Sequence, residues 1–543
     1  MKSYKLLYLL LPLFLLFSCE DFITRDHPTS VTDNDFWQTQ SQVESALGSC
    51  VHLPYGCRYW STPYYNRICF EGATDNLYHP GFWLRAIRSI GNSTITPSET
   101  QIIREFWENR YLLIRRCCRL IENIDKSYFT LEEEREHILG EAYVYRAMYH
   151  MELLFYYGFH EGVPVMMESL SGENIYMGRQ PVDVAADLIL EDLDKAEQLL
   201  PFKWDEGRST RMSGATAIAL KSTVNLNVKR YAEAAAEAKK IIDSGMFELF
   251  YTPSTDNTPG KNYRDLFYHV GEVNNERILY RTDGAQGGWR LLAPGINGAA
   301  VDVPTRPIVD AYETKQGKTI FELGNDSIEI YQKDPLYNFN RDPRLYHSIM
   351  VPGDDYSFPQ FNYKYNPFDN SSVDHISQGN ASPTGFVCKK FADPLDKGTP
   401  DFGGIDYMII RYAEILLNYV EALVESGNFS NPDVVRYLNE IRRRADMPDI
   451  DVSVYNTQDK LRELYRRERR IELAFEGQRI WDIRRWGIGE EVMNGQVLGA
   501  FNPASGEFVQ VETRFYDSPK NDQWPIHNAE ITTNLKLKQN SGW

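Results

Sequence analysis

The chain has 543 residues, with 58 lysines and arginines against 76 aspartates and glutamates, and a formal net charge of −18 at pH 7. This acidic balance argues against nucleic acid, or any anionic phosphate surface, as the main partner. The length is sufficient for a large buried core and for two or three ordinary domains.

Residues 1–18 have the layout of a bacterial lipoprotein signal peptide. Two lysines precede an apolar run that is shorter than the roughly 20 residues needed to span a bilayer. The run ends in Leu-Phe-Ser-Cys at residues 16–19, which resembles a lipobox, so we expect cleavage before Cys19 and lipid on its thiol. Residues 19–34 are then expected to form a lipidated tether. The alternative is an ordinary signal peptide with an incidental cysteine.

Helical patterns dominate residues 35–245. A Thr-x-x-Glu capping box at Thr130 predicts the start of a helix, and Gly158 is expected to end it. Further helices are expected at 183–200, 213–228 and 231–243, the last closed by Gly245. These helical hairpins are about 30–35 residues long, which predicts tetratricopeptide-like repeats. The apolar face of the first helix, at helical spacing, consists of Ile138, Ala142, Tyr145, Tyr149, Leu153 and Tyr156.

Glycine, proline, aspartate and asparagine become frequent between residues 246 and 405, and apolar periodicity fades, which predicts a long loop-rich insertion. Residues 406–543 are predicted to form a C-terminal helical region. Asn431 and Pro432 predict the cap and the first position of one of its helices. Another helix is expected from about Asp459 through Glu476, whereas the tail from residue 488 has no strong periodicity. The predicted fold class is therefore mainly α, a tetratricopeptide-like helical repeat scaffold with a long loop-rich insertion.

Two regions, residues 52–85 and 284–298, carry aromatic side chains that are expected to be exposed. Aromatic rings can stack on the C–H faces of sugars, and loops on a rigid scaffold are the usual place for recognition residues. The alternative is that these rings pin their loops to the scaffold. We predict Trp83 and Trp289 as stacking platforms. The full set of candidate ligand-binding residues is Asp75, Asn76, Tyr78, Phe82, Trp83, Arg85, Trp289 and Arg290.

The cysteines show no metal-finger spacing. Cys117 and Cys118 are expected to pack in a core, and one disulfide is possible among Cys50, Cys57 and Cys69 if the chain is secreted. In the insertion, three loop acids are either solvated or donate oxygens to calcium, without an EF-hand pattern. They are Asp393, Asp396 and Asp401.

The sequence contains no nucleophile elbow, zinc-protease, Walker or dinucleotide-binding motif. Glycoside hydrolysis needs only two carboxylates at the right separation, so 76 acidic residues leave it open. The clearest charged cluster is the segment 467–487, where both signs recur at helical spacing. We interpret this cluster as a buried ion-pair network that holds helices together, with a catalytic site as the alternative.

Four motifs of the chain resemble those of the SusD/RagB family of Bacteroidetes outer-membrane lipoproteins. One is the segment 467–487, and a second is Arg-Tyr-Ala-Glu-Ile-Leu-Leu at 411–417. A third is Arg-Asp-Pro-Arg-Leu at 341–345, and the fourth runs from Trp524 to the C-terminus. Together with the lipobox, they carry the resemblance along the whole chain. The departures from the family pattern are His527, Leu535, Ser541 and Trp543.

The resemblance implies a helical scaffold whose loop-rich insertion binds ligand. It implies a surface lipoprotein, anchored in the outer membrane through Cys19, that binds a glycan as the lid of a SusC-type TonB-dependent transporter. The acidic pair Glu20-Asp21 resembles the export signal of such lipoproteins. No catalytic activity and no cofactor are implied. A peptide receptor of the RagB type and, less strongly, a surface glycoside hydrolase are the alternatives.

Overall fold

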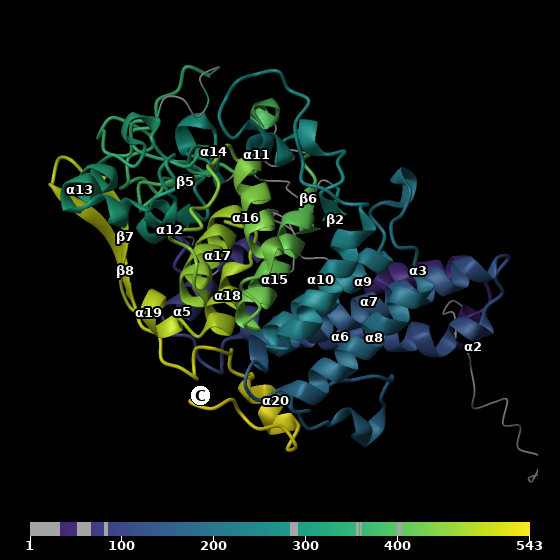
Figure 1. Cartoon of the computed structure of the whole chain (residues 1–543). Coiled ribbons are helices and arrows are strands. Elements are labelled where there is room, and N and C mark those ends of the chain that lie inside the picture. Colours follow the sequence, from purple (N-terminus) through teal and green to yellow (C-terminus); the bar gives the residue numbers. More distant parts are fainter. Residues whose placement is uncertain are drawn as a thin grey trace, which may run out of the picture.

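The computed structural model describes residues 33–51, 67–80, 85–282, 291–354, 358, 361–398 and 404–543. Paired helices form its N-terminal part and a second group of helices its C-terminal part, with short helices and strands between them in sequence (Figure 1). The predicted mainly α class with a helical repeat scaffold is confirmed. The signal peptide and nearly all of the tether, including Cys19, lie outside the described residues.

The N-terminal helices pack against one another in sequence order, α6 on α7, α7 on α8, α8 on α9 and α9 on α10. All six predicted apolar positions of α7 are buried, and Gly158 follows its last residue as predicted. The helices of this part are α2 (Asp33–Phe36), α3 (Gln40–Cys50), α4 (Arg67–Glu71), α5 (Arg85–Gly91), α6 (Glu105–Asn123), α7 (Glu132–Tyr157), α8 (Val182–Leu199), α9 (Gly214–Asn227) and α10 (Tyr231–Ser244).

The predicted capping box at Thr130 is wrong. Helix α7 begins at Glu132, its N-cap residue is Leu131, and no side chain caps it. Three glutamates in its first turn, starting at Glu132, instead place negative charge at the positive end of the helix dipole. The end of α10 agrees with the prediction, because Gly245 adopts a left-handed conformation with φ of 62°.

The C-terminal helices are joined to the N-terminal repeats through α15, which packs on α10 as well as on α16 and α17. Asn431 caps α16 through a bond from the Asp433 N–H, and Pro432 is its first residue, as predicted. Helix α17 ends at Glu472, earlier than predicted, because Phe475 and the glycine at 477 adopt positive φ. These helices are α15 (Tyr412–Glu425), α16 (Pro432–Arg444), α17 (Gln458–Glu472), α18 (Arg479–Trp486), α19 (Gly489–Met493) and α20 (Asn528–Thr533).

The insertion between the two helical groups contains short helices and strands. The helices are α11 (Lys261–Leu266), α12 (Arg306–Ala311), α13 (Asn325–Lys333) and α14 (Pro343–Ser348). The strands of the described chain pair antiparallel as β1–β3, β2–β6, β4–β5 and β7–β8. They are β1 (Leu77–Tyr78), β2 (Arg277–Arg281), β3 (Val303–Pro304), β4 (Ile349–Met350), β5 (Val387–Cys388), β6 (Tyr407–Arg411), β7 (Gly495–Asn502) and β8 (Glu507–Arg514).

The β7–β8 hairpin lies in the tail for which the sequence shows no strong periodicity. It extends along one edge of the molecule, beside α12 and α13 of the insertion (Figure 1). Two register shifts interrupt the pairing, and the outer strand β8 is largely solvent-facing. The alternation that marks a strand in sequence is therefore broken. Within the described ranges, no helix combines the length and the apolar character needed to span a membrane.

Candidate ligand-binding face

Described residues next to the two predicted aromatic regions contact one another. Tyr78 on β1 lies opposite Val303 on β3. Tyr78, Ala300, Val303 and Val497 form one buried apolar cluster. The Ala300 N–H donates to the Leu292 carbonyl at 2.9 Å, which ties the segment after residue 290 to the same cluster. Described residues that border 81–84 and 283–290 are therefore linked through one cluster, although they are about 200 positions apart in the chain.

Four of the predicted ligand residues lie in these two segments. Phe82 and Trp83 belong to 81–84, and Trp289 and Arg290 belong to 283–290, so all four are outside the described residues. Their role as stacking platforms and hydrogen-bond partners stays a prediction.

The structure places Asp75 and Asn76 inside the protein. The Asp75 carboxylate accepts hydrogen bonds from Arg479 at 2.8 and 2.9 Å and pairs with Arg470 at 2.8 Å. Asn76 donates to Glu71 at 2.7 Å and accepts from Arg470 at 2.8 Å. Burial by itself raises the pKa of Asp75, but Arg470 and Arg479 outweigh it and hold this pKa at about 2. Both side chains link the segment before β1 to the C-terminal helices. Because they are buried and hydrogen-bonded within the protein, the proposed ligand-binding residues do not include them.

Tyr78 and Arg85 have different surroundings. The Tyr78 ring is buried, and the Arg88 guanidinium lies 5.4 Å from its centroid, so this ring supports the face rather than presenting an open surface. Burial also raises the pKa of Tyr78. Arg85 is exposed at the start of α5, directly after residues 81–84, and its contact with a ligand stays a prediction.

A buried contact next to β1 fixes the same cluster. His79 Nδ1 lies 2.8 Å from Asp302 Oδ1, and both side chains are fully buried. This contact joins the residue after β1 to the residue before β3. Sequence analysis missed it, because no local pattern links positions 223 residues apart.

A small cleft of about 390 Å³ adjoins the segment that follows residues 283–290. Pro294 forms part of its wall, and the rest comes from residues 370–380 of the insertion. Side-chain amides and hydroxyls in this wall suit sugar hydroxyls, because each can donate and accept. Sequence reasoning also missed these residues, although their cluster of asparagine, serine and glutamine was visible. They are Asn370, Ser371, Ser372, Gln378 and Asn380.

Part of the charged segment 467–487 belongs to one buried ion-pair network, in line with our interpretation of the sequence, through Arg467, Glu468, Glu472 and Glu476. Six basic and six acidic side chains of the described chain are connected, and the charges balance. Such an arrangement holds helices together, whereas a catalytic carboxylate needs access to substrate. The members are Arg344, Lys390, Arg411, Arg442, Arg444 and Arg467 with Glu276, Glu313, Asp342, Glu468, Glu472 and Glu476.

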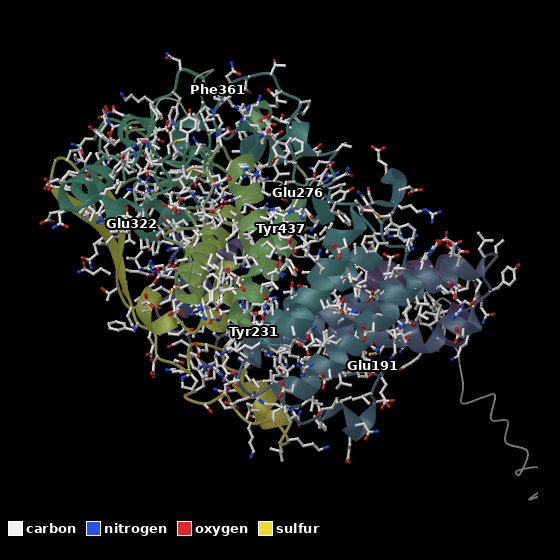
Figure 2. All side chains as sticks on the ribbon, viewed as in Figure 1. Glu191, Tyr231, Glu276, Glu322, Phe361 and Tyr437 are labelled. Carbon is white, nitrogen blue, oxygen red and sulfur yellow. The ribbon has the colours of Figure 1, made fainter. Side chains whose placement is uncertain are left out.

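Glu472 lies at the centre of this network. Its carboxylate pairs with Arg411 at 2.7 Å, with Arg344 at 3.0 Å and with Arg444. Burial opposes ionisation of Glu472, but the three guanidiniums outweigh it and hold its pKa far below the ordinary value. Glu276, labelled in Figure 2, extends the network to β2 by pairing with Arg411 and Arg444.

Two of the three loop acids that could donate oxygens to calcium, Asp393 and Asp396, contact other groups of the protein. Asp393 accepts from the backbone N–H groups of His269 and Leu395, each at 2.9 Å. Asp396 lies 3.0 Å from the imidazole of His269. Asp401 is outside the described residues. Across the part of the chain that the structure describes, no group of three or more His, Cys, Asp or Glu side chains is arranged to hold a metal ion.

The cysteines follow the core-packing interpretation where they are described. Cys117 and Cys118 are buried free thiols, and burial raises the pKa of both. Cys50 is also a free thiol, so none of the possible disulfides that include it is formed. Cys57 lies outside the described residues.

The SusD family model matches residues 246–543. A second model, described as "Starch-binding associating with outer membrane", matches residues 33–226. The chain therefore belongs to the SusD family, and the resemblance seen in its motifs is confirmed.

Solved structures and sequence relatives agree with this assignment. A SusD-like protein from Bacteroides fragilis NCTC 9343 superposes with a TM-score of 0.77 at 27% identity, covering 94% of this chain and 99% of that chain. A SusD-like carbohydrate binding protein from the same strain has a TM-score of 0.77 at 26% identity, covering 93% and 100%. A SusD-like protein from Formosa agariphila is 24% identical, covering 98% of this chain and 97% of its own length.

Proposed function

We propose that the protein is a cell-surface lipoprotein that binds a glycan and delivers it to a SusC-type TonB-dependent transporter. The observation that supports the proposal is the link between Tyr78, which precedes residues 81–84, and Ala300 and Leu292, which follow residues 283–290. We propose that the stacking rings of these two segments share one face. The carbohydrate-binding relative of the same fold and the starch-binding family description add support.

The expected affinity suits such a receptor. Each stacked ring contributes about 0.5–1.5 kcal/mol. Three or four rings with a few hydrogen bonds then reach a dissociation constant of roughly millimolar to micromolar. A receptor that must release its ligand to a transporter needs binding of this weak kind.

The test is a binding titration of the full chain with neutral oligosaccharides, comparing Trp83→Ala, Trp289→Ala and Arg85→Ala with Tyr128→Ala. Tyr128 serves as the control, because its side chain is 75% exposed and it lies between α6 and α7, far from β1 in sequence. Each tryptophan variant should weaken binding by roughly 1 kcal/mol with an unchanged melting temperature. A lower melting temperature with unchanged affinity would mean that the rings are loop anchors.

We propose that the protein is not catalytic. The carboxylates of the buried ion-pair network around Glu472 are all paired with arginine or lysine. Any glycan that binds should keep its chain length during incubation. Shorter products that disappear on changing one Asp or Glu would favour a hydrolase. A peptide that binds the wild type but not Trp83→Ala or Trp289→Ala, while no glycan binds, would favour the RagB-type alternative.

The cellular part of the proposal rests on Cys19 as the lipid anchor and on a transporter partner. Detergent extracts should contain an outer-membrane barrel of the SusC type that co-purifies with the protein. Recovery of the free monomer alone, under conditions that preserve related complexes, would count against the role as a transporter lid.

A further inference from the structure

A cleft of about 650 Å³ lies at the junction of the helical repeats and β2. One wall comes from the α8–α9 connection, with Trp204 and Glu206, and the other includes Tyr251 and Tyr280. Its volume is within the range of about 300–1,000 Å³ typical of ligand sites. Figure 1 shows β2 and the β7–β8 hairpin on opposite sides of α15 and α17, so this cleft lies away from Val497 on β7 and the cluster to which it belongs. Residues 283–290, which follow β2, lie outside the described residues. We call it the junction cleft.

Hydrogen bonds hold the walls of the junction cleft in place. The Lys203 ammonium donates to the Met246 carbonyl at 3.0 Å and to Asn275 Oδ1 at 2.8 Å, which bridges the two walls. The Trp204 indole N–H donates to the Met212 carbonyl at 2.7 Å. A site whose walls are already fixed loses little conformational freedom when it binds.

Several groups in the junction cleft are available to a ligand. The Tyr251 side chain is 58% exposed. The exposed Glu206 carboxylate forms no hydrogen bond or ion pair with any described residue. Lys203 uses two of its three N–H donors in the bonds given above. Arg277 is not among the available groups, because its side chain is 10% exposed, its guanidinium pairs with Asp406 and it lies 3.8 Å from the centroid of the Tyr280 ring.

We propose that the junction cleft is a second saccharide site, specific for a neutral oligosaccharide. The Tyr251 ring stacks on the C–H face of one sugar unit. Glu206 accepts hydrogen bonds from neighbouring hydroxyls, and the remaining N–H of Lys203 donates to a sugar oxygen. The ligand class rests on the proposed function, whereas the position of the site does not.

The charges of the lining favour a neutral ligand over an acidic one. Lys203 and Arg277 are offset by Glu206 and Glu248, and Arg277 is already paired with Asp406 at 2.5 Å. A uronate or sulfate group would therefore meet a lining in which the Glu206 and Glu248 carboxylates outnumber Lys203, whose hydrogen bonds go to neutral acceptors. A hydroxyl finds both donors and acceptors.

The experiment is a titration of the full chain with laminari-, malto-, cello- and xylo-oligosaccharides and with an oligoglucuronate. Tyr251→Ala and Glu206→Gln are compared with Tyr128→Ala and Glu463→Gln, two exposed residues outside the cleft. We expect one neutral oligosaccharide whose affinity falls about three- to tenfold in Tyr251→Ala. A smaller loss, roughly two- to fivefold, is expected in Glu206→Gln, because a charged acceptor becomes a neutral one. Both controls should bind like the wild type, and all variants should keep the wild-type melting temperature.

The same titrations in Trp83→Ala and Trp289→Ala separate the two sites. Binding that depends on Tyr251 but survives loss of either tryptophan supports the junction cleft, even if the proposed ligand-binding face fails. Binding that depends on the tryptophans and is unchanged in Tyr251→Ala and Glu206→Gln overturns the junction cleft and leaves the proposed function intact. A higher affinity for the oligoglucuronate than for the neutral oligosaccharides also overturns the proposal. So does an affinity loss in Tyr251→Ala and Glu206→Gln that occurs only with a peptide ligand, or the absence of binding of any saccharide.

Discussion

Replacing Glu472 by glutamine is the sharpest test of the buried network. The substitution keeps the size of the side chain but removes the charge that faces Arg344, Arg411 and Arg444. All four side chains are essentially fully buried, so water cannot compensate for the loss. Breaking a buried pair by removing one partner costs about 3–5 kcal/mol. That is a large part of the roughly 5–15 kcal/mol by which a folded domain is stable.

The assay is equilibrium unfolding in urea, followed by circular dichroism. Glu463→Gln is the matched control, because Glu463 is exposed on the same helix α17 and should change stability by less than about 0.5 kcal/mol. The double variant Glu472→Gln with Arg444→Met should be less destabilised than the sum of the single variants. If Glu472→Gln unfolds like the control, the network does not hold the helices together and our reasoning is refuted.

His150 is buried, and burial lowers its pKa to about 3, so the unfolded state binds the proton more strongly between pH 6.5 and 3 and stability falls as pH drops through this window. His150→Gln should remove about 2 kcal/mol of the stability difference between pH 8 and pH 5, and unfolding curves that keep the wild-type pH dependence would contradict this. Cys19→Ala should release the protein from membranes or leave it unprocessed, as checked by fractionation and lipid labelling; normal labelling would disprove the anchor. Trp289→Ala should lower glycan affinity without changing the melting temperature, and glycan chain length should be unchanged after incubation with the wild type.

Local sequence patterns predicted the long helices well. Asn431 and Pro432 placed the start of α16 correctly, because a cap and a first-turn proline act within a few residues. The prediction from Thr130 was wrong although it also rests on a local pattern, because the N-cap residue of α7 is Leu131, one position later. The β7–β8 hairpin escaped notice because its register shifts break the two-residue alternation.

The candidate site was harder to predict, because its supports are contacts between distant positions. Asp75 and Asn76 have the composition of a polar loop, yet Arg470 and Arg479 draw them into the interior. Tyr78 belongs to a ring-rich region but packs against residues of the insertion and the tail. No periodicity encodes such pairings. Arg85, by contrast, is exposed where the sequence placed it.

The segment that carries β1 is held by residues from far along the chain. Asp75 pairs with Arg470 and Arg479, and the Glu71 carboxylate accepts from the backbone N–H of Gly477 at 2.8 Å. A chain that emerges from its N-terminus therefore exposes residues 67–80 about 400 positions before their partners are synthesised. Residues 67–80 lack these hydrogen bonds and ion pairs until then. A chain truncated before Arg479 can complete its N-terminal helices and still fail to fix residues 67–80 in place.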